Sequence, residues 1–200
     1  MPYQVTDLSK HPKPVAGNYF FDTNVLLYVM GVSSNQQYES NYINFFNDVF
    51  TISITSKSSR ILTTSLQISE LFNRLLKLES RKAFIKTGYS KGEYNFYKEV
   101  FRKGDDITKT YQQFKSDFLA YRDGFDLIPC PVLTIDKILD YSPNKTDIND
   151  NLYVELTKSQ KATIVTHDGD LFVEDLPILT MNNKLIAASR NFTVTPVKTT

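Results

Sequence analysis

Four acidic residues stand at places in the sequence where a strand would end or a helix would begin. Asp22 follows an aromatic run that favours a strand, and the spacing of apolar residues then changes to that of a helix. Asp168 follows a second strand-favouring run. Glu70 lies within the first two turns of one expected helix, and Asp150 opens another, with Asp147 one turn earlier. Each acid could instead be a helix cap or a charge that favours a helix N-terminus.

Together these acids would form a metal site. In a sheet built from strand-helix units, the carboxyl ends of the strands open toward one edge, where ligands bind. Four carboxylates at that edge would repel one another strongly unless a cation lay between them. Oxygen ligands without an obligatory Cys or His favour Mg2+ or Mn2+ over zinc. Such an ion lowers the pKa of a bound water and neutralises charge while a phosphodiester is attacked.

Strands that alternate with helices must position these acids. This order predicts an α/β fold with three layers, in which helices cover both faces of a mostly parallel sheet. The expected strands are 18–21, 61–64, 125–129, 162–166 and 177–180. The expected helices are 25–31, 38–50, 65–78, 105–121, 135–141, 147–156 and 184–190. Residues 1–17 are expected to form a surface leader, 51–60 a loop, and Ser65 the cap of the helix that carries Glu70.

Length and composition indicate one domain. A chain of 200 residues with 41% hydrophobic content is long enough for one full core, so we expect a single domain, 1–200. The single cysteine, Cys130, cannot form an internal disulfide, which fits a reducing compartment. We find no signal peptide and no apolar run long enough for a membrane span. We therefore expect a soluble, cytoplasmic protein without a membrane partner.

Basic and aromatic residues alternate in the middle of the chain. From Arg74 to Arg122 there are twelve Lys or Arg and six Asp or Glu, a net charge of +6; because the whole chain carries +1, the remainder carries −5. Such a segment suits a nucleic-acid surface, where cations meet phosphates and rings stack on unpaired bases. The alternative is a helical hairpin whose rings pack inward and whose lysines are merely solvated. The candidate RNA contacts are Lys91, Lys98, Arg102 and Lys103.

Four stretches of the sequence resemble, in order, the motifs of the PIN domain. This nuclease fold occurs in the VapC-like toxins of bacterial toxin-antitoxin pairs and in several RNA-processing nucleases. The matching stretches are Phe20–Leu26, Thr64–Leu71, Asp150–Leu156, and Ala162–Asp168 with Asp170–Phe172. The resemblance implies a PIN-like fold in which 77–125 is a helical insertion. The residues that it would assign are Asp22, Glu70, Asp150 and Asp168 as metal-binding and catalytic acids, Asp170 as a secondary acid, and Asn24 and Thr166 as supporting polar groups.

Two features depart from the family pattern. The third motif usually continues into small residues, whereas here it contains Tyr153, Glu155 and Lys158, so this helix is expected to pack differently. The segment 77–125 also exceeds the length of compact toxin-like members.

The resemblance implies an endoribonuclease that depends on Mg2+ or Mn2+ and acts on RNA, with a toxin role as one version of it. Its further implied partners are an antitoxin protein and a second copy in a homodimer. The alternative is a PIN-like module that binds RNA or protein without cutting. Phosphoryl transfer on Asp22, as in the haloacid dehalogenase group, is disfavoured because Asn24 stands where that group has a second Asp.

Overall fold

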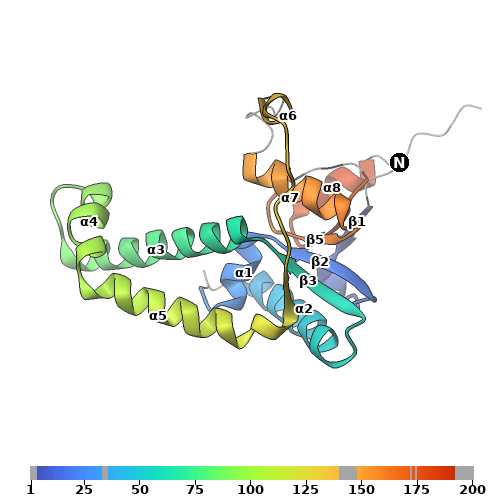
Figure 1. Ribbon diagram of the computed structural model, residues 1–200, viewed down its shortest axis with the longest axis horizontal. Helices are drawn as coiled ribbons and strands as arrows, with labels where there is room; N and C mark the ends of the chain where they lie inside the picture. The colour runs from blue at the N-terminus through green and yellow to red at the C-terminus, as the bar shows by residue number, and fades with distance from the viewer. Residues whose placement is uncertain (1–3, 33–35, 140–147, 172, 174, 192–200) are drawn as a thin grey trace, which may run out of the picture.

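The structure is a computed structural model that describes residues 4–32, 36–139, 148–171, 173 and 175–191 (Figure 1). Its described strands form one six-stranded sheet in the order β1-β6-β5-β2-β3-β4, and every neighbouring pair is parallel. The strands are β1 Gln4–Asp7, β2 Gly17–Phe21, β3 Ser59–Thr63, β4 Phe125–Leu127, β5 Thr163–Val165 and β6 Pro177–Thr180. The predicted α/β fold with a parallel sheet is therefore confirmed.

Helices occupy most of the remaining described chain. The α-helices are α1 Thr23–Val29, α2 Gln37–Thr55, α3 Ser65–Thr87, α4 Glu93–Glu99, α5 Asp105–Ala120, α6 Ile135–Leu139, α7 Ile148–Ser159 and α8 Asn183–Asn191. Three short 3-10 helices are η1 Leu8–Lys10, η2 Phe101–Lys103 and η3 Arg122–Gly124. Among the described helices, none is both long enough and apolar enough to cross a bilayer.

Alternation of side chains along β2 divides the core into two layers. Tyr19 and Phe21 point to one face of the sheet, which α1, α2, α3 and α5 cover, and Phe20 points to the other, which α7 and α8 cover. All three rings are at most 2% exposed. Strands that are apolar on both faces are typical of a parallel sheet between two helical layers, as Figure 1 shows.

The expectation of a surface leader is wrong for residues 4–10, which form β1 and η1, whereas residues 11–16 are mostly exposed. β1 pairs with β6, from Gln4 opposite Pro177 to Asp7 opposite Thr180, and Leu8 in η1 is 1% exposed. β1 is only four residues long, and its partner strand, β6, lies about 170 positions later in the chain. Local sequence therefore gives little indication of this strand.

The expected loop 51–60 is also wrong at both ends, because α2 continues to Thr55 and β3 begins at Ser59. The hydroxyls of Thr51 and Thr55 donate to the carbonyls one turn earlier, at 2.8 and 2.6 Å. A Ser/Thr-rich segment can stay helical when its hydroxyls are satisfied in this way.

A helical arm, residues 77–120, projects from the sheet. It contains the last part of α3, then α4 and η2 at its far end, and α5, which returns toward β4 (Figure 1). The expected insertion 77–125 is helical over most of its length, but its first residue falls inside α3. Phe96 and Phe101 are buried at the far end of the arm, whereas Tyr94 is 66% exposed. Some rings of the segment therefore pack inward, as in a helical hairpin, while others face solvent, and the nucleic-acid surface stays a prediction.

Candidate functional site

Asp22 lies at the point where the strand order reverses. From β2 the chain proceeds through β3 to β4 on one side, whereas β5 and β6 lie on the other side of β2. The backbone N–H of Asp22 donates to the carbonyl of Val165 at 2.9 Å, which joins the ends of β2 and β5. In open parallel sheets, the crevice beyond such a reversal is where ligands bind.

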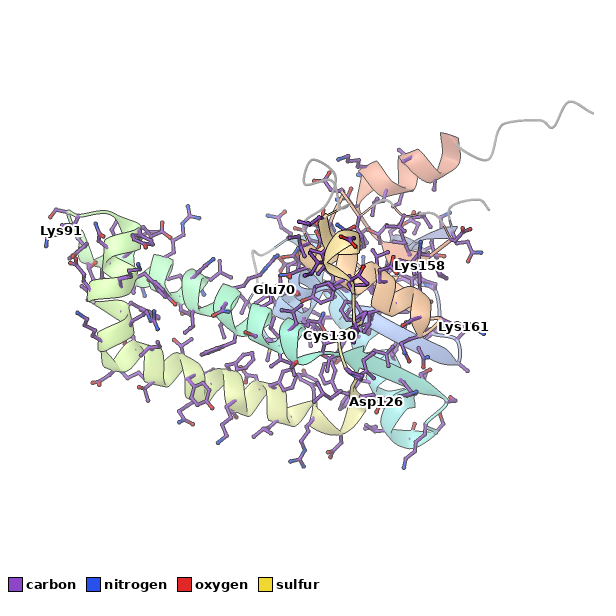
Figure 2. The ribbon with its side chains drawn as sticks, turned by 45° about the horizontal axis from the view of Figure 1, so that its top comes forward. Glu70, Lys91, Asp126, Cys130, Lys158 and Lys161 are labelled. Carbon is purple, nitrogen blue, oxygen red and sulfur yellow. The ribbon has the colours of Figure 1, made fainter. Side chains whose placement is uncertain are left out.

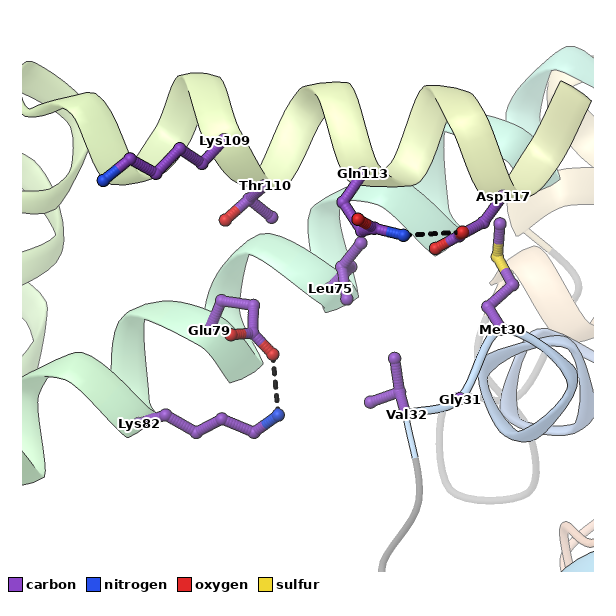
Figure 3. A pocket seen from close by; sticks show the side chains of 10 residues that line it. All are labelled: Met30, Gly31, Val32, Leu75, Glu79, Lys82, Lys109, Thr110, Gln113 and Asp117. Carbon is purple, nitrogen blue, oxygen red and sulfur yellow. Dashed lines mark hydrogen bonds and ion pairs between the residues drawn. The ribbon is translucent and has the colours of Figure 1, made fainter.

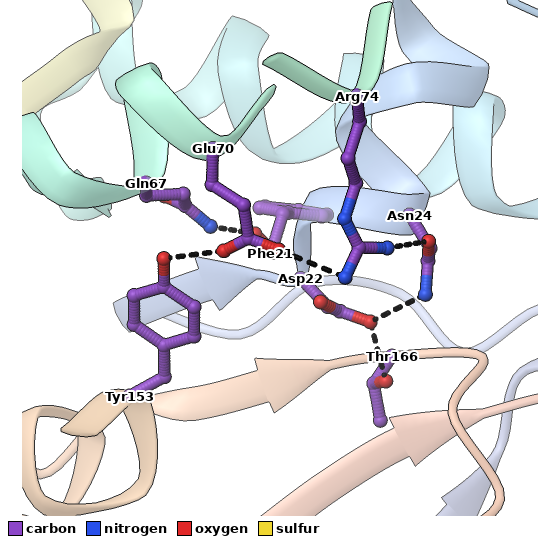
Figure 4. A network of polar contacts seen from close by, with 8 residues as sticks. All are labelled: Phe21, Asp22, Asn24, Gln67, Glu70, Arg74, Tyr153 and Thr166. Atoms are coloured by element: carbon purple, nitrogen blue, oxygen red, sulfur yellow. Dashed lines mark hydrogen bonds and ion pairs between the residues drawn. The ribbon is translucent and has the colours of Figure 1, made fainter. Parts of the chain in front are cut away.

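The Asp22 side chain faces this crevice rather than capping α1. It stands at the N-cap position but makes no capping hydrogen bond with its side chain. Its Oδ2 accepts from Thr166 Oγ1 at 2.9 Å and, more weakly, from Asn24 Nδ2 at 3.5 Å (Figure 4). The interpretation of Asp22 as a simple helix cap is therefore not supported, and the two polar groups predicted to support it both touch it.

Burial raises the pKa of Asp22 from 3.8 to about 6. The hydrogen bond from Thr166 and the charge of Arg74 oppose this rise, whereas the carboxylates of Asp168 and Glu70 add to it. Two of the other predicted acids, Asp168 and Glu70, therefore lie near enough to act on the charge of Asp22. The negative charge at the end of β2 is only partly compensated within the described protein.

Polar contacts at the start of α3 fix this helix against β2. Thr64, rather than the expected Ser65, caps it by accepting from the N–H of Gln67 at 3.1 Å. The Gln67 side chain is fully buried; its Nε2 donates to the carbonyl of Phe21 at 2.7 Å, and its Oε1 accepts from Thr63 Oγ1 at 2.9 Å. Sequence reasoning gave Gln67 no role, yet it joins the helix that carries Glu70 to the strand that carries Asp22.

Glu70 is held by two groups that sequence reasoning did not assign. Its Oε1 lies 2.8 Å from Arg74 Nη2, and its Oε2 accepts from Tyr153 Oη at 2.7 Å (Figure 4). Nη1 of Arg74 donates to Asn24 Oδ1 at 2.6 Å, so the guanidinium connects Glu70 to the residue beside Asp22. Glu70 is therefore more than a charge that favours a helix N-terminus.

A sequence signal existed for each of these partners. Arg74 follows Glu70 by four residues, a spacing at which opposite charges meet on a helix. Tyr153 was one of the large residues that departed from the family pattern. It packs on Phe20 with ring centroids 5.0 Å apart, which directs its hydroxyl across the end of the sheet toward α3.

Asp168 and Asp170 lie in the turn after β5, but their carboxylates have different partners. Thr166 Oγ1, which donates to Asp22, accepts from the N–H of Asp168 at 2.9 Å, so one hydroxyl links the two acidic positions. Oδ1 of Asp168 accepts from the N–H of Asp170 at 2.9 Å. The Asp170 carboxylate forms an ion pair with Lys184 and is largely exposed. Asp170 thus lies at the margin of the cluster.

Asp150 occupies the first turn of α7 and is partly exposed. It precedes Tyr153 by one turn, so the two residues share a side of the helix. Asp147 lies outside the described residues. Among the residues that the structure describes, no three His, Cys, Asp or Glu side chains converge closely enough to hold a metal ion.

The chemistry of the donors nevertheless suits a hard divalent cation. Asp22, Glu70, Asp168 and Thr166 offer only oxygen atoms, the ligands that Mg2+ and Mn2+ prefer. Burial raises the pKa of Asp22, and the charges of Asp168 and Glu70 add to the rise, although Arg74 opposes it. These acids therefore offer suitable ligand chemistry, while Arg74 pairs with Glu70.

The candidate RNA-contact residues lie on the arm, away from these acids. Figure 2 places Lys91 at the far end of the arm and Glu70 near the sheet. Lys91 forms an ion pair with Glu99 at 3.7 Å, whereas Lys98 and Arg102 lie over tyrosine rings. The arm cations and the acids therefore belong to separate regions of the surface.

A cavity of about 420 Å³ lies between α3, α5 and the end of α1, and none of the four predicted metal-binding acids lines it (Figure 3). Glu79 and Lys82 in its wall form an ion pair at 2.7 Å, and Gln113 donates to Asp117 at 2.7 Å. The acidic side chains in its wall therefore already have partners, and we assign no function to this cavity.

Comparisons with known proteins identify no family and no function for this chain. No family model matches the sequence, and no curated protein matches it. The crystal structure of PAE2754 from Pyrobaculum aerophilum is similar, with a TM-score of 0.44 and 16% sequence identity over 89% of this chain and 93% of that chain. Because so distant a likeness carries no functional argument, the function has to be argued from the contacts of the acidic cluster.

Proposed function

We propose that this chain is a nuclease of the PIN type that depends on Mg2+ or Mn2+ and hydrolyses phosphodiester bonds of RNA. The observation that carries the proposal is the partly compensated charge of Asp22 at the reversal of strand order. Burial raises its pKa to about 6, and the carboxylates of Asp168 and Glu70 add to this rise. A cluster of this kind has little structural value of its own but offers oxygen ligands to a cation.

Asp22, Glu70 and Asp168 would hold the ion, with Asp150 on the adjacent helix and Asp170 at the margin. When bound, the ion would supply a Lewis acid that polarises a phosphoryl oxygen and lowers the pKa of water. Thr166 orients the Asp22 carboxylate and the turn that carries Asp168.

Arg74 and Tyr153 would act on the substrate side of this cluster. Arg74 is 39% exposed, and its guanidinium can contact a phosphate in the same planar manner in which it now contacts Glu70. The Tyr153 hydroxyl keeps the Glu70 carboxylate in place while Arg74 changes partner.

The family resemblance supports RNA as the substrate, an antitoxin partner and a homodimer, and the proposal includes all three. The proposed cytoplasmic location rests on the cysteine content and on the sequence lacking a recognisable signal peptide. An antitoxin would have to cover the acids, and an Arg or Lys presented to the carboxylates would do so most directly.

Cleavage of a labelled RNA by Asp22→Asn tests the proposal. Loss of the carboxylate should reduce the cleavage rate by at least about 100-fold in Mn2+, because residues that hold a metal act as a unit. The matched control is Asp123→Asn, which removes an 81% exposed carboxylate from η3, just before β4. If Asp22→Asn cuts as fast as the parent and the control, the proposal is wrong.

A second candidate is an RNA- or protein-binding module without catalysis. The contact of Arg74 with Glu70 favours it, because an internal guanidinium already provides one positive charge. Calorimetry with Mn2+ separates the two, since a scaffold of this kind should show no saturable site that Asp22→Asn removes.

A further inference from the structure

α4 and η2, at the far end of the arm, carry three exposed cations that make no ion pair among the described residues: Lys98, Arg102 and Lys103. Some other bases of the arm are paired, for example Arg81 with Glu93 at 3.9 Å and Lys109 with Asp106 at 3.7 Å. We call the three cations together with Tyr94 and Tyr97 the arm-end patch.

The acid closest to this patch in the chain is already satisfied. Glu99 accepts from Tyr89 Oη at 2.6 Å and pairs with Lys91 at 3.7 Å, and these contacts lower its pKa. Lys103 acts on it only as a more distant charge. The patch thus keeps a net charge of about +3, counted as fully protonated Lys and Arg at neutral pH.

Helix geometry directs the patch to solvent. Tyr94 and Lys98 are one turn apart on α4, on the side opposite Phe96, which is 3% exposed and packs inside the arm. The Lys98 ammonium lies 4.5 Å from the centroid of the Tyr94 ring, and the Arg102 guanidinium 5.9 Å from that of Tyr97. Because Phe96 already fills the interior of the arm, the Tyr94 ring stays at the surface, where it is 66% exposed.

A single-stranded nucleic acid fits this combination better than an acidic protein segment. Cations beside exposed rings can bind a phosphate and stack an adjoining base, whereas an acidic peptide would gain from the charges alone. Charge together with an exposed ring is the observation that favours RNA.

Distance separates this patch from the acidic cluster. From Glu70, α3 continues for seventeen residues to its last residue, Thr87, and a rise of 1.5 Å per residue makes this about 25 Å. α4 follows at the far end of the arm (Figure 1). A stacked strand presents one phosphate per about 3.4 Å, so the gap corresponds to roughly seven nucleotides.

We propose that the arm-end patch is a second RNA-binding site that holds the substrate strand on the order of 25 Å from the acidic cluster. The proposal rests on the proposed function for the identity of the ligand. A stacked RNA shorter than about seven nucleotides does not reach from the patch to the acidic cluster, whereas a longer strand can contact the patch and a metal ion held by the acids together.

Binding of fluorescent, unstructured RNA to the full chain in a chelator tests this site without relying on cleavage. The test variant is Lys98→Gln/Arg102→Gln/Lys103→Gln. The matched control, Lys10→Gln/Lys13→Gln/Lys158→Gln, removes three exposed charges from the body of the protein, where Figure 2 shows Lys158 far from the arm end. All six side chains are exposed, and circular dichroism verifies that both variants fold.

Loss of three phosphate contacts should reduce the slope of log K against log salt by about 2, which is about a 100-fold weaker affinity at 0.1 M salt if the proteins converge at 1 M. The control should change the affinity by less than about threefold. Tyr94→Leu should weaken binding by roughly fivefold or more without changing the slope, because stacking carries no charge.

Equal slopes and affinities for the parent and the test variant would overturn the proposal. Competition by polyglutamate as strong as that by RNA of equal charge would also overturn it, by assigning the patch to an acidic protein. Because binding is measured without metal, a parent that binds RNA through the arm but never cleaves would refute the proposed nuclease and leave this site standing.

Discussion

Replacing Asp22 by Asn should make the metal-free protein more stable at neutral pH. A folded-state pKa of about 6 against an ordinary 3.8 means that keeping this carboxylate charged costs about 3 kcal/mol of unfolding free energy above pH 6. Asp22 remains partly accessible to solvent, so we expect a measured gain of about 1–2 kcal/mol for the variant. For a chain of this length the gain corresponds to about 2–8 °C in melting temperature.

The sign of the pH dependence follows from proton binding. Between about pH 4 and pH 6 the folded parent binds more protons than the unfolded chain, so its free energy of unfolding decreases as pH rises through this window. Asp22→Asn lacks this contribution. The difference between variant and parent should therefore be small near pH 4, grow toward pH 6 and stay constant above about pH 7.

Thermal and urea unfolding in a chelator across this pH range measure the effect. Asp123→Asn, in which the lost carboxylate is 81% exposed, should change stability by less than about 0.5 kcal/mol at every pH. A variant less stable than the parent at neutral pH, with no trend toward acid, would refute the reasoning that Asp22 is buried with uncompensated charge.

Four further predictions follow from individual contacts. Mn2+ should raise the melting temperature of the parent with concentration but leave Asp22→Asn unchanged, as differential scanning fluorimetry would show, because a ligand stabilises only a fold that binds it. Tyr153→Phe removes the 2.7 Å hydrogen bond to Glu70 and should cost about 1–2 kcal/mol in urea unfolding, while the ring continues to pack on Phe20. Asp170→Asn should reduce the RNA cleavage rate far less than Asp22→Asn, because the Asp170 carboxylate is exposed and bound to Lys184. Gly124→Ala would place a Cβ 2.3 Å from the Phe50 ring and should cost about 1–3 kcal/mol by thermal unfolding, whereas Gly31→Ala, with open space but a positive φ, tests backbone strain alone.

The sequence predicted the strand that ends at Asp22 and the helix that carries Glu70, because aromatic runs and apolar spacing are local signals. The sequence did not predict which side chains meet across the sheet. Tyr153 contacts Glu70, 83 positions away in the chain, and Gln67 contacts Phe21, 46 positions away. Such pairs depend on how α7 and α3 pack, which periodicity does not specify. β1 was missed for the same reason.

The proposed metal site was also predicted only in part. Residue types and their order predicted four acids at one edge, and in the structure the charges of Glu70 and Asp168 both raise the pKa of Asp22 beyond the effect of burial. The four-residue spacing of Glu70 and Arg74 suggested at most an ion pair on the surface of a helix. That Arg74 pairs with a predicted metal ligand became visible only in the structure.

The hydrogen bond between Thr166 and Asp22 joins residues 144 positions apart. During synthesis the chain emerges from its N-terminus at about 5–20 residues per second, so Asp22 is exposed for many seconds before β5 exists to pair with β2. Until then the acidic cluster lacks Thr166 and the turn with Asp168. Because long-range parallel pairing is also a slow step of folding, the completed site is one of the last features that the nascent molecule acquires.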